Sequence, residues 1–158
     1  MLFSKTFGYA LRGILYIALV TDEKEKVHVD EIAEKLAVPR HFMGKILKRL
    51  VKHDLLQSTK GPAGGFTLSD ITLAIPLWNL IEITDGLGSF TNCVLRLQEC
   101  NSDNPCPLHS KIEATRLELR NVFTNTTIGE LLHEDKQEFI RSIATFDVTK
   151  VFVKDPVY

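Results

Sequence analysis

The sequence predicts a mainly helical protein with one small β-hairpin, arranged as a winged helix-turn-helix domain followed by a long helix. Apolar residues recur at helical spacing in several segments. Two strand-like runs flank a Gly/Pro-rich turn directly after a basic helix, and a further amphipathic helix follows a loop that contains all three cysteines. With 158 residues, 44% of them apolar and 25% charged, the chain can build one core.

Residues 6–20 are almost continuously apolar and predict a buried first helix, which ends at the polar residues 21–26. A second, short helix follows. We expect Asp30 to be its N-cap, because a carboxylate there can accept hydrogen bonds from the free amides of the first turn. This helix ends before Pro39, since the residue preceding a proline is disfavoured in the helical conformation.

The third predicted helix, Pro39 to His53, has an apolar and a basic face. Positions 42, 43, 46, 47, 50 and 51 are apolar and form one stripe. The opposite face is basic, and a tight turn joins this helix to the short one before it. This arrangement is typical of a helix-turn-helix whose second helix enters the major groove of DNA.

The charge distribution agrees with that interpretation. The net charge is only −1, but residues 1–60 hold 11 Lys/Arg against 7 Asp/Glu, whereas residues 61–158 hold 8 against 13. A basic cluster alone is more often a solvated surface; its place on a helix-turn-helix favours DNA. We expect base-edge contacts from Arg40, His41 and Lys45, and phosphate contacts from the remaining cations. The full predicted set on this helix is Arg40, His41, Gly44, Lys45, Lys48, Arg49 and Lys52.

Residues 55–58 and 66–68 predict the two strands of a hairpin around the turn at positions 60–65. Directly after a basic helix, such a hairpin is typical of the wing of a winged helix-turn-helix, with Lys60 and Gly61 at its DNA-contacting tip. Its Gly-x2-Gly-Gly run lacks the lysine and hydroxyl of a phosphate-binding loop, so nucleotide binding is not expected.

A helix starting at Pro76 is expected to reach about Thr84. After a loop over residues 87–107, a helix is expected over residues 107–124, in which Leu108, Ile112, Thr115, Leu119 and Val122 recur at spacings of 4, 3, 4 and 3 and suit packing against a second copy. Thr127 is expected to cap a short helix, and residues 135–146 form a weak last helix. The predicted dimer seam consists of Ile112, Thr115, Leu119 and Val122.

These elements divide the chain into a winged helix-turn-helix DNA-binding domain (1–86), a cysteine-bearing loop (87–107) and a dimerisation helix with C-terminal helices (108–158). The longest apolar run is 12 residues and contains Arg12, whereas a membrane span needs about 20 apolar residues. No membrane segment is expected. The N-terminal region lacks a signal-peptide cleavage site, so we expect a cytoplasmic protein with reduced thiols.

The cysteines form a compact pattern, Cys93-x6-Cys100-x5-Cys106, and His109 follows at x2. If a helix begins at Pro107, Cys106 is its cap and shares a face with His109. Four interpretations remain open: an iron–sulfur cluster, a Cys3His zinc site, a thiol–disulfide switch and inert thiols. We favour the cluster, because thiolates and imidazole are ligands of two-iron clusters, whereas the close Cys-x2-Cys pair of structural zinc sites is missing.

A catalytic alternative uses Cys106 as a nucleophile and His109 as its base. The sequence indicates no third group to orient the base and no oxyanion site, and a basic winged helix would have no role. We therefore do not expect an enzyme.

In its order of features, the chain resembles the bacterial Rrf2 family, whose members include IscR-like and NsrR-like proteins. The resemblance rests on SKTFGYALRGILYIAL near the N-terminus, LLQSTKGPAGGF at the wing, IEITDG, the cysteines and TTIGELL at residues 126–132. The first cysteine gap is one residue longer than the common x5. An acidic ligand of NsrR-like members would correspond to Gly8, and the x2 spacing of His109 matches the IscR-like histidine ligand.

The resemblance implies a homodimeric transcription factor, often a repressor, that binds a pseudo-palindromic operator in double-stranded DNA. Residues 39–52 would be the recognition helix, Lys60 the wing residue in the minor groove and residues 107–124 the dimer helix. It also implies a cluster, 2Fe-2S in type, on Cys93, Cys100, Cys106 and His109. DNA binding would then respond to redox state, nitric oxide or cluster supply. The alternative is a zinc-stabilised or thiol–disulfide-switched regulator without a cluster.

Overall fold

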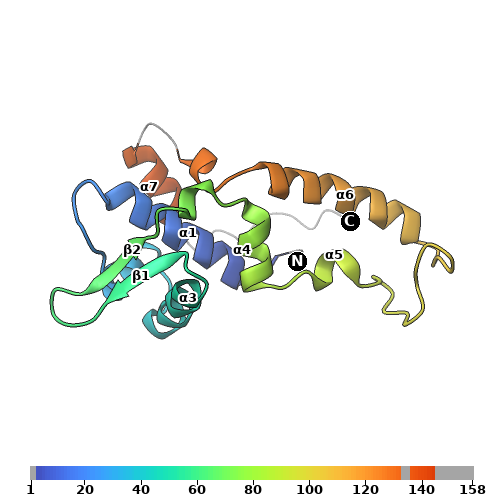
Figure 1. Cartoon of the computed structure of the whole chain (residues 1–158), viewed down its shortest axis with the longest axis horizontal. Coiled ribbons are helices and arrows are strands. Elements are labelled where there is room, and N and C mark those ends of the chain that lie inside the picture. Colours follow the sequence, from blue (N-terminus) through green and yellow to red (C-terminus); the bar gives the residue numbers. More distant parts are fainter. Residues whose placement is uncertain (1–2, 133–135, 145–158) are drawn as a thin grey trace, which may run out of the picture.

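The computed structural model describes residues 3–132 and 136–144. The molecule is elongated: a helical body with a β-hairpin continues into an arm formed by α5, α6 and the loop between them (Figure 1). The predicted class, mainly helical with one antiparallel hairpin and a winged helix-turn-helix, is confirmed. Within the described residues, every helix is too short or too polar to span a membrane.

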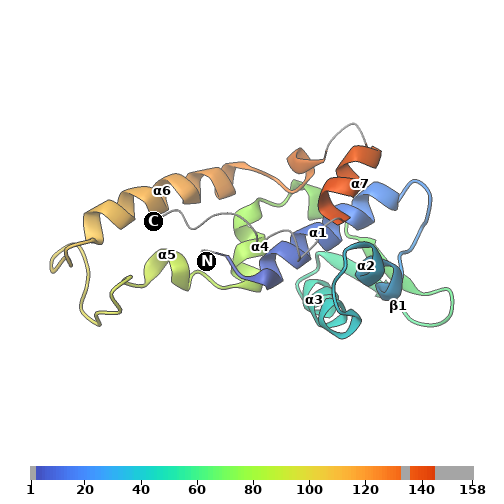
Figure 2. The same cartoon turned by 180° about the vertical axis from the view of Figure 1, so that it is seen from behind.

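The core forms around α1 (Lys5–Val20), as its apolar sequence predicts. Ser4 caps this helix by accepting a hydrogen bond from the backbone N–H of Phe7 at 3.2 Å. Ile14 and Ile17 are almost completely buried. The other body helices surround α1 (Figures 1 and 2), so the elements of the body are positioned by their packing against it.

The helix-turn-helix consists of α2 (Val29–Lys35) and α3 (Arg40–Lys52). Ala37 in the turn has a φ of 51°, and the N–H of Val38 closes the turn on the carbonyl of Ala33 at 2.9 Å. The prediction of Asp30 as N-cap is wrong. The helix begins at Val29 with His28 at the cap, and Asp30 lies inside the first turn.

The wing is a two-stranded antiparallel sheet of β1 (Leu56–Thr59) and β2 (Gly65–Leu68), in which Ser58 lies opposite Phe66. Val27, just before α2, exchanges two backbone hydrogen bonds with Phe66, of 3.0 and 2.9 Å, and so fixes the wing to the helix-turn-helix. Gly65 has a φ of 149°, and a β-carbon there would lie 2.9 Å from the carbonyl oxygen of Val27. The close pairing of these backbones therefore requires glycine.

After η1 (Thr72–Ala74), α4 (Leu77–Thr84) begins directly behind Pro76, as predicted. The short helix α5 (Gly88–Thr91) lies inside the segment expected to be a loop. The long helix α6 (His109–Asn125) begins two residues later than predicted, so Cys106 is not its cap. Instead, the carbonyl of Cys106 accepts a hydrogen bond from the N–H of His109 at 3.0 Å, and His109 is the first helical residue.

Two elements return the chain to the body. Beside η2 (Gly129–Leu131), Thr127 Oγ1 accepts from the N–H of Glu130, as expected of a cap. The last helix described is α7 (Lys136–Ala144). Arg12 of α1 donates to the carbonyls of Leu36 and Ile143, at 2.8 and 2.6 Å, and so links α7 to the helix-turn-helix. The ends of the predicted 135–146 helix lie outside the described residues.

Candidate metal centre and nucleic-acid interface

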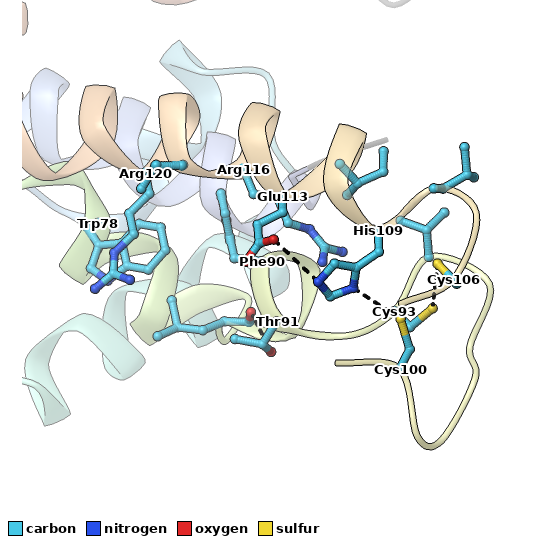
Figure 3. Close-up of a pocket in the computed structure, with 15 residues that line it drawn as sticks. Trp78, Phe90, Thr91, Cys93, Cys100, Cys106, His109, Glu113, Arg116 and Arg120 are labelled. Carbon is cyan, nitrogen blue, oxygen red and sulfur yellow. Dashed lines mark hydrogen bonds and ion pairs between the residues drawn. The ribbon is translucent and has the colours of Figure 1, made fainter. Parts of the chain in front are cut away.

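The cysteines lie together at the end of the arm farthest from the body (Figure 3). Cys93 follows α5, Cys100 lies within the loop, and Cys106 directly precedes α6. The three Sγ atoms lie within 4.8 Å of one another, and each cysteine is partly buried. The loop thus brings together the three thiols that were predicted from the sequence as ligands.

The donor atoms form two close pairs. The Sγ atoms of Cys93 and Cys106 are 3.8 Å apart, and Sγ of Cys100 is 3.2 Å from Nδ1 of His109. For a tetrahedral ion with metal–sulfur bonds of about 2.3 Å, two thiolates are roughly 3.8 Å apart. The first pair therefore has the spacing of two thiolates on one metal ion, and His109 lies where it can complete a mixed S/N set.

The thiols differ in acidity. The backbone of Leu97 hydrogen-bonds to Cys93 and lowers the pKa of its thiol. A backbone hydrogen bond from Cys106 lowers the pKa of Cys100, but burial and the neighbouring cysteine side chains outweigh it, so the pKa of Cys100 is raised. The loop backbone therefore favours the thiolate form at Cys93, the form that binds metals and reacts with oxidants.

His109 lies between the cysteines and an acidic side chain. Its Nε2 is 3.4 Å from a carboxylate oxygen of Glu113, one helical turn further along α6, and its side chain is 18% exposed (Figure 3). Sequence reasoning missed Glu113. The i,i+4 spacing from a candidate histidine ligand was the signal that could have found it.

A cavity of about 340 Å³ extends from the cysteines along α6 toward α4. Phe90 and Trp78 form part of its wall, with an edge-to-face contact at a centroid separation of 4.7 Å. Arg120 lies over the Trp78 ring at 5.3 Å, and Arg116 donates to the carbonyl of Asn92 at 2.5 Å. These contacts attach α6 to α4 and to the chain just before Cys93, and they connect the candidate metal centre to the body.

The predicted DNA-contacting cations of α3 are all exposed, and Gly44 is partly buried among them. Lys60 and Gly61 are exposed at the wing tip. The buried side of α3 holds Met43, Ile46, Leu47 and Leu50. The fold thus presents one continuous basic helix face while its apolar face anchors it, which is the arrangement that major-groove binding needs.

One of these cations is already paired. The guanidinium of Arg40 forms an ion pair with Asp30 of α2, and its hydrogen bond lowers the pKa of that carboxyl group. Both side chains are more than half exposed, so the pair contributes little to stability. It orients Arg40 at the start of the basic face.

The predicted dimer seam is split between two environments. Ile112 and Leu119 are partly buried, whereas Thr115 and Val122 are exposed. None of the residues of α6 is fully buried. Phe123 packs against Phe3, with a centroid separation of 4.8 Å. One face of α6 therefore contacts its own body and leaves part of the predicted seam free.

Comparison with known proteins gives one consistent result. The Rrf2 family, described as "Iron-dependent Transcriptional regulator", matches residues 3–134. A protein of Aquifex aeolicus, named as an HTH-type transcriptional regulator, is 37% identical over 142 residues, which cover 88% of this chain and 97% of that protein. The HTH-type transcriptional repressor NsrR of Streptomyces coelicolor is 28% identical over 73% of this chain and 74% of its own.

Solved structures share the fold. The structure of CymR, the global cysteine regulator of B. subtilis, matches with a TM-score of 0.63 at 20% identity, covering 81% of this chain and 93% of that chain. The winged helix, hairpin and long helix of the present structure thus form an arrangement already seen in a solved bacterial regulator.

Proposed function

Because the chain belongs to the Rrf2 family of iron-dependent transcriptional regulators, we propose that it is a homodimeric DNA-binding regulator controlled by an iron–sulfur cluster. Its homologues are transcriptional regulators and not enzymes. Cys93, Cys100, Cys106 and His109 are the proposed ligands. We further propose that it acts in the cytoplasm as a repressor, as the name of one relative suggests.

The geometry of the cysteines supports a bound cluster. Three thiols within 4.8 Å of one another, with an imidazole nitrogen 3.2 Å from one of them, form a ready donor set. Thiolate and imidazole are ligands of two-iron clusters, which favours 2Fe-2S. When bound, such a cluster would supply a centre that changes redox state and reacts with nitric oxide.

DNA binding would use two copies of α3 in successive major grooves of a pseudo-palindromic operator. Arg40, His41 and Lys45 would read base edges near the start of the helix, and the remaining cations would contact phosphates. Lys60 would reach the adjacent minor groove from the wing. The exposed basic face of α3, anchored through its apolar side, supports this assignment.

The cluster would control DNA binding through the arm. The cysteine loop is joined to α6 at Cys106 and through Arg116, which binds the carbonyl of Asn92, and α6 is joined to α4 of the body through Arg120. A bound cluster would order this loop and set the angle between α6 and the DNA-binding body, and hence the spacing of the two recognition helices in a dimer. Cluster loss or nitrosylation would change that spacing.

A second candidate function is a thiol–disulfide switch. Sγ of Cys93 and Sγ of Cys106 are 3.8 Å apart, and the pKa of Cys93 is lowered. The two thiols could lose two protons and two electrons to an oxidant such as a peroxide and form one disulfide. A structural zinc ion on the same donors is the remaining alternative.

One sample distinguishes these functions. The full chain is purified without oxygen, and its visible absorption and circular dichroism spectra are recorded together with assays for iron, sulfide and zinc. Visible charge-transfer bands with equal iron and sulfide are expected. Stoichiometric zinc without colour would replace the sensor with a structural site. A colourless protein that stays metal-free after cluster reconstitution, and that forms a Cys93–Cys106 disulfide with peroxide, would favour the switch.

A further inference from the structure

The two ring nitrogens of His109 face different groups. Nδ1 lies 3.2 Å from Sγ of Cys100, and Nε2 lies 3.4 Å from a carboxylate oxygen of Glu113 (Figure 3). A neutral imidazole carries its proton on one nitrogen and keeps a lone pair on the other. The neighbours therefore decide which nitrogen of His109 can bind a metal ion.

Nε2 is the nitrogen that needs a partner. This nitrogen is buried and has no hydrogen-bond partner among the described residues. Leaving a buried polar atom unpaired is costly, and a carboxylate oxygen of Glu113 lies 3.4 Å away as a candidate acceptor. The Glu113 side chain is 66% exposed, so its carboxylate can move and stays hydrated.

We propose that Glu113 is a positioning residue for His109: its carboxylate accepts a hydrogen bond from Nε2–H and leaves the Nδ1 lone pair directed toward the Cys100 sulfur. This inference rests on the proposed function, because it assigns a role in holding the metal centre. Metal-binding histidines commonly donate their second N–H to a carboxylate, which fixes the ring and strengthens its electron donation.

Because His109 and Glu113 occupy consecutive turns of α6, the residue that would orient the imidazole belongs to the same helix and not to the cysteine loop. His109 is also the first residue of α6. A change in ligation at Nδ1 would therefore act at the start of the helix that joins the metal centre to the body.

The test compares Glu113→Ala and Glu113→Gln with wild type as full chains carrying their native metal centre. Glu118→Ala and Glu118→Gln are the matched controls, since Glu118 is exposed on α6 about 140° around the helix from Glu113. Three quantities are measured: the rate of iron loss to a chelator, the reduction potential, and nitrogen hyperfine coupling in the reduced protein by pulsed electron paramagnetic resonance.

Glu113→Ala is expected to lose iron roughly 10-fold faster, in line with the cost of removing such hydrogen-bond partners. Its reduction potential should rise, because a less polarised imidazole donates less electron density, and its nitrogen coupling should weaken. Glu113→Gln, which keeps an acceptor oxygen, should fall between Glu113→Ala and wild type. Both Glu118 variants should match wild type.

Two results would overturn the inference while leaving the cluster in place. One is a wild-type protein with iron and sulfide but without coordinated-nitrogen coupling, which would remove His109 as a ligand. The other is Glu113→Ala with the iron loss, potential and coupling of Glu118→Ala. A wild-type protein without iron and sulfide would overturn the proposed function, and this inference with it.

Discussion

Gly44 is partly buried at the edge of the basic face of α3, next to Arg40, His41, Lys45 and Lys48 in the helical order. A β-carbon added there would meet Val29 Cγ2 at 3.8 Å, an ordinary contact. Packing within the protein therefore does not require glycine at this position. Glycine is also unfavourable inside a helix, so its presence needs another reason. If α3 enters the major groove as proposed, the missing side chain would allow DNA to approach the helix closely.

Gly44→Ala should therefore have opposite effects on folding and on binding. Helix propensity favours alanine by about 1 kcal/mol, so the free energy of unfolding should rise, which urea denaturation would measure. Binding to a duplex selected from random sequences by the wild-type protein should weaken, because the added methyl group stands in the contact face. Unchanged or tighter binding would remove Gly44 from the interface.

Lys48 tests the division between phosphate and base contacts. Lys48→Ala should weaken binding to the selected duplex and to unrelated duplexes alike, and it should reduce the slope of log K against log salt by about 1. Lys45→Ala should weaken the selected duplex more than the others. Fluorescence anisotropy at several salt concentrations measures both, with Lys111→Ala on α6 as control. Selective loss in Lys48→Ala would show that it reads bases.

Individual site residues were predictable to different degrees. The cysteines were found because thiols are rare and closely spaced, and the cations of α3 because helical periodicity separates them from the apolar stripe. Glu113 was missed, since an acidic residue on an exposed helix is unremarkable until the direction of His109 is known. Asp30 was misassigned because α2 begins one residue earlier, at Val29, which places Asp30 in the first turn, where it pairs with Arg40.

At the scale of elements, the turn between α6 and α7 depends on a reciprocal cap. The carboxylate of Glu130 accepts from the N–H and hydroxyl of Thr127, at 2.6 and 3.0 Å, and Thr127 Oγ1 accepts from the N–H of Glu130 at 3.3 Å. Hydrogen bonds from the backbone and then the hydroxyl of Thr127 lower the pKa of Glu130 below 4.5. This is the capping-box arrangement.

A lowered pKa in the folded state means that the ionised carboxylate stabilises the fold above the ordinary pKa and that this contribution disappears as the pH falls through the folded value. Glu130→Gln should lower the free energy of unfolding at pH 7 and lose less stability than wild type below about pH 4.5. Thr127→Ala should cost about 1 kcal/mol at pH 7. Parallel stability curves for wild type and Glu130→Gln between pH 7 and 3 would contradict the assignment.

Elements with a strong apolar periodicity were predicted closely. The start of α6 and the helix α5, which border or lie within the segment expected to be a loop, were not. The bounds of α1, α3 and the hairpin fall within a residue or two of expectation, because apolar stripes and glycines define them locally. The start of α6 moved from Pro107 to His109 because the backbone first turns at Cys106. The helix α5 lacks a periodic pattern, and its Phe90 is placed by long-range contact with Trp78.

At the scale of the molecule, apolar exposure is concentrated in the arm. Six of the eight exposed large apolar side chains among the described residues lie between positions 94 and 122. The 17 residues of α6 extend about 25 Å, and the helix has no fully buried residue of its own. A surface of this kind is typical of a site that a protein partner covers, and the predicted seam makes a second copy the expected partner.

Val122→Glu tests that expectation, because Val122 is 57% exposed in the single chain and its replacement should leave the fold intact. In a dimer two copies of the seam would meet, so each added carboxylate would be buried against apolar atoms without a counter-charge. Sedimentation velocity should show a dimer for wild type and a monomer for Val122→Glu, with unchanged circular dichroism.

The control is Thr124→Glu, about 160° away around α6, which should remain dimeric. If Thr124→Glu dissociates and Val122→Glu does not, the interface lies on the side of Leu117. In that case the partner would close the cavity beside the cysteines.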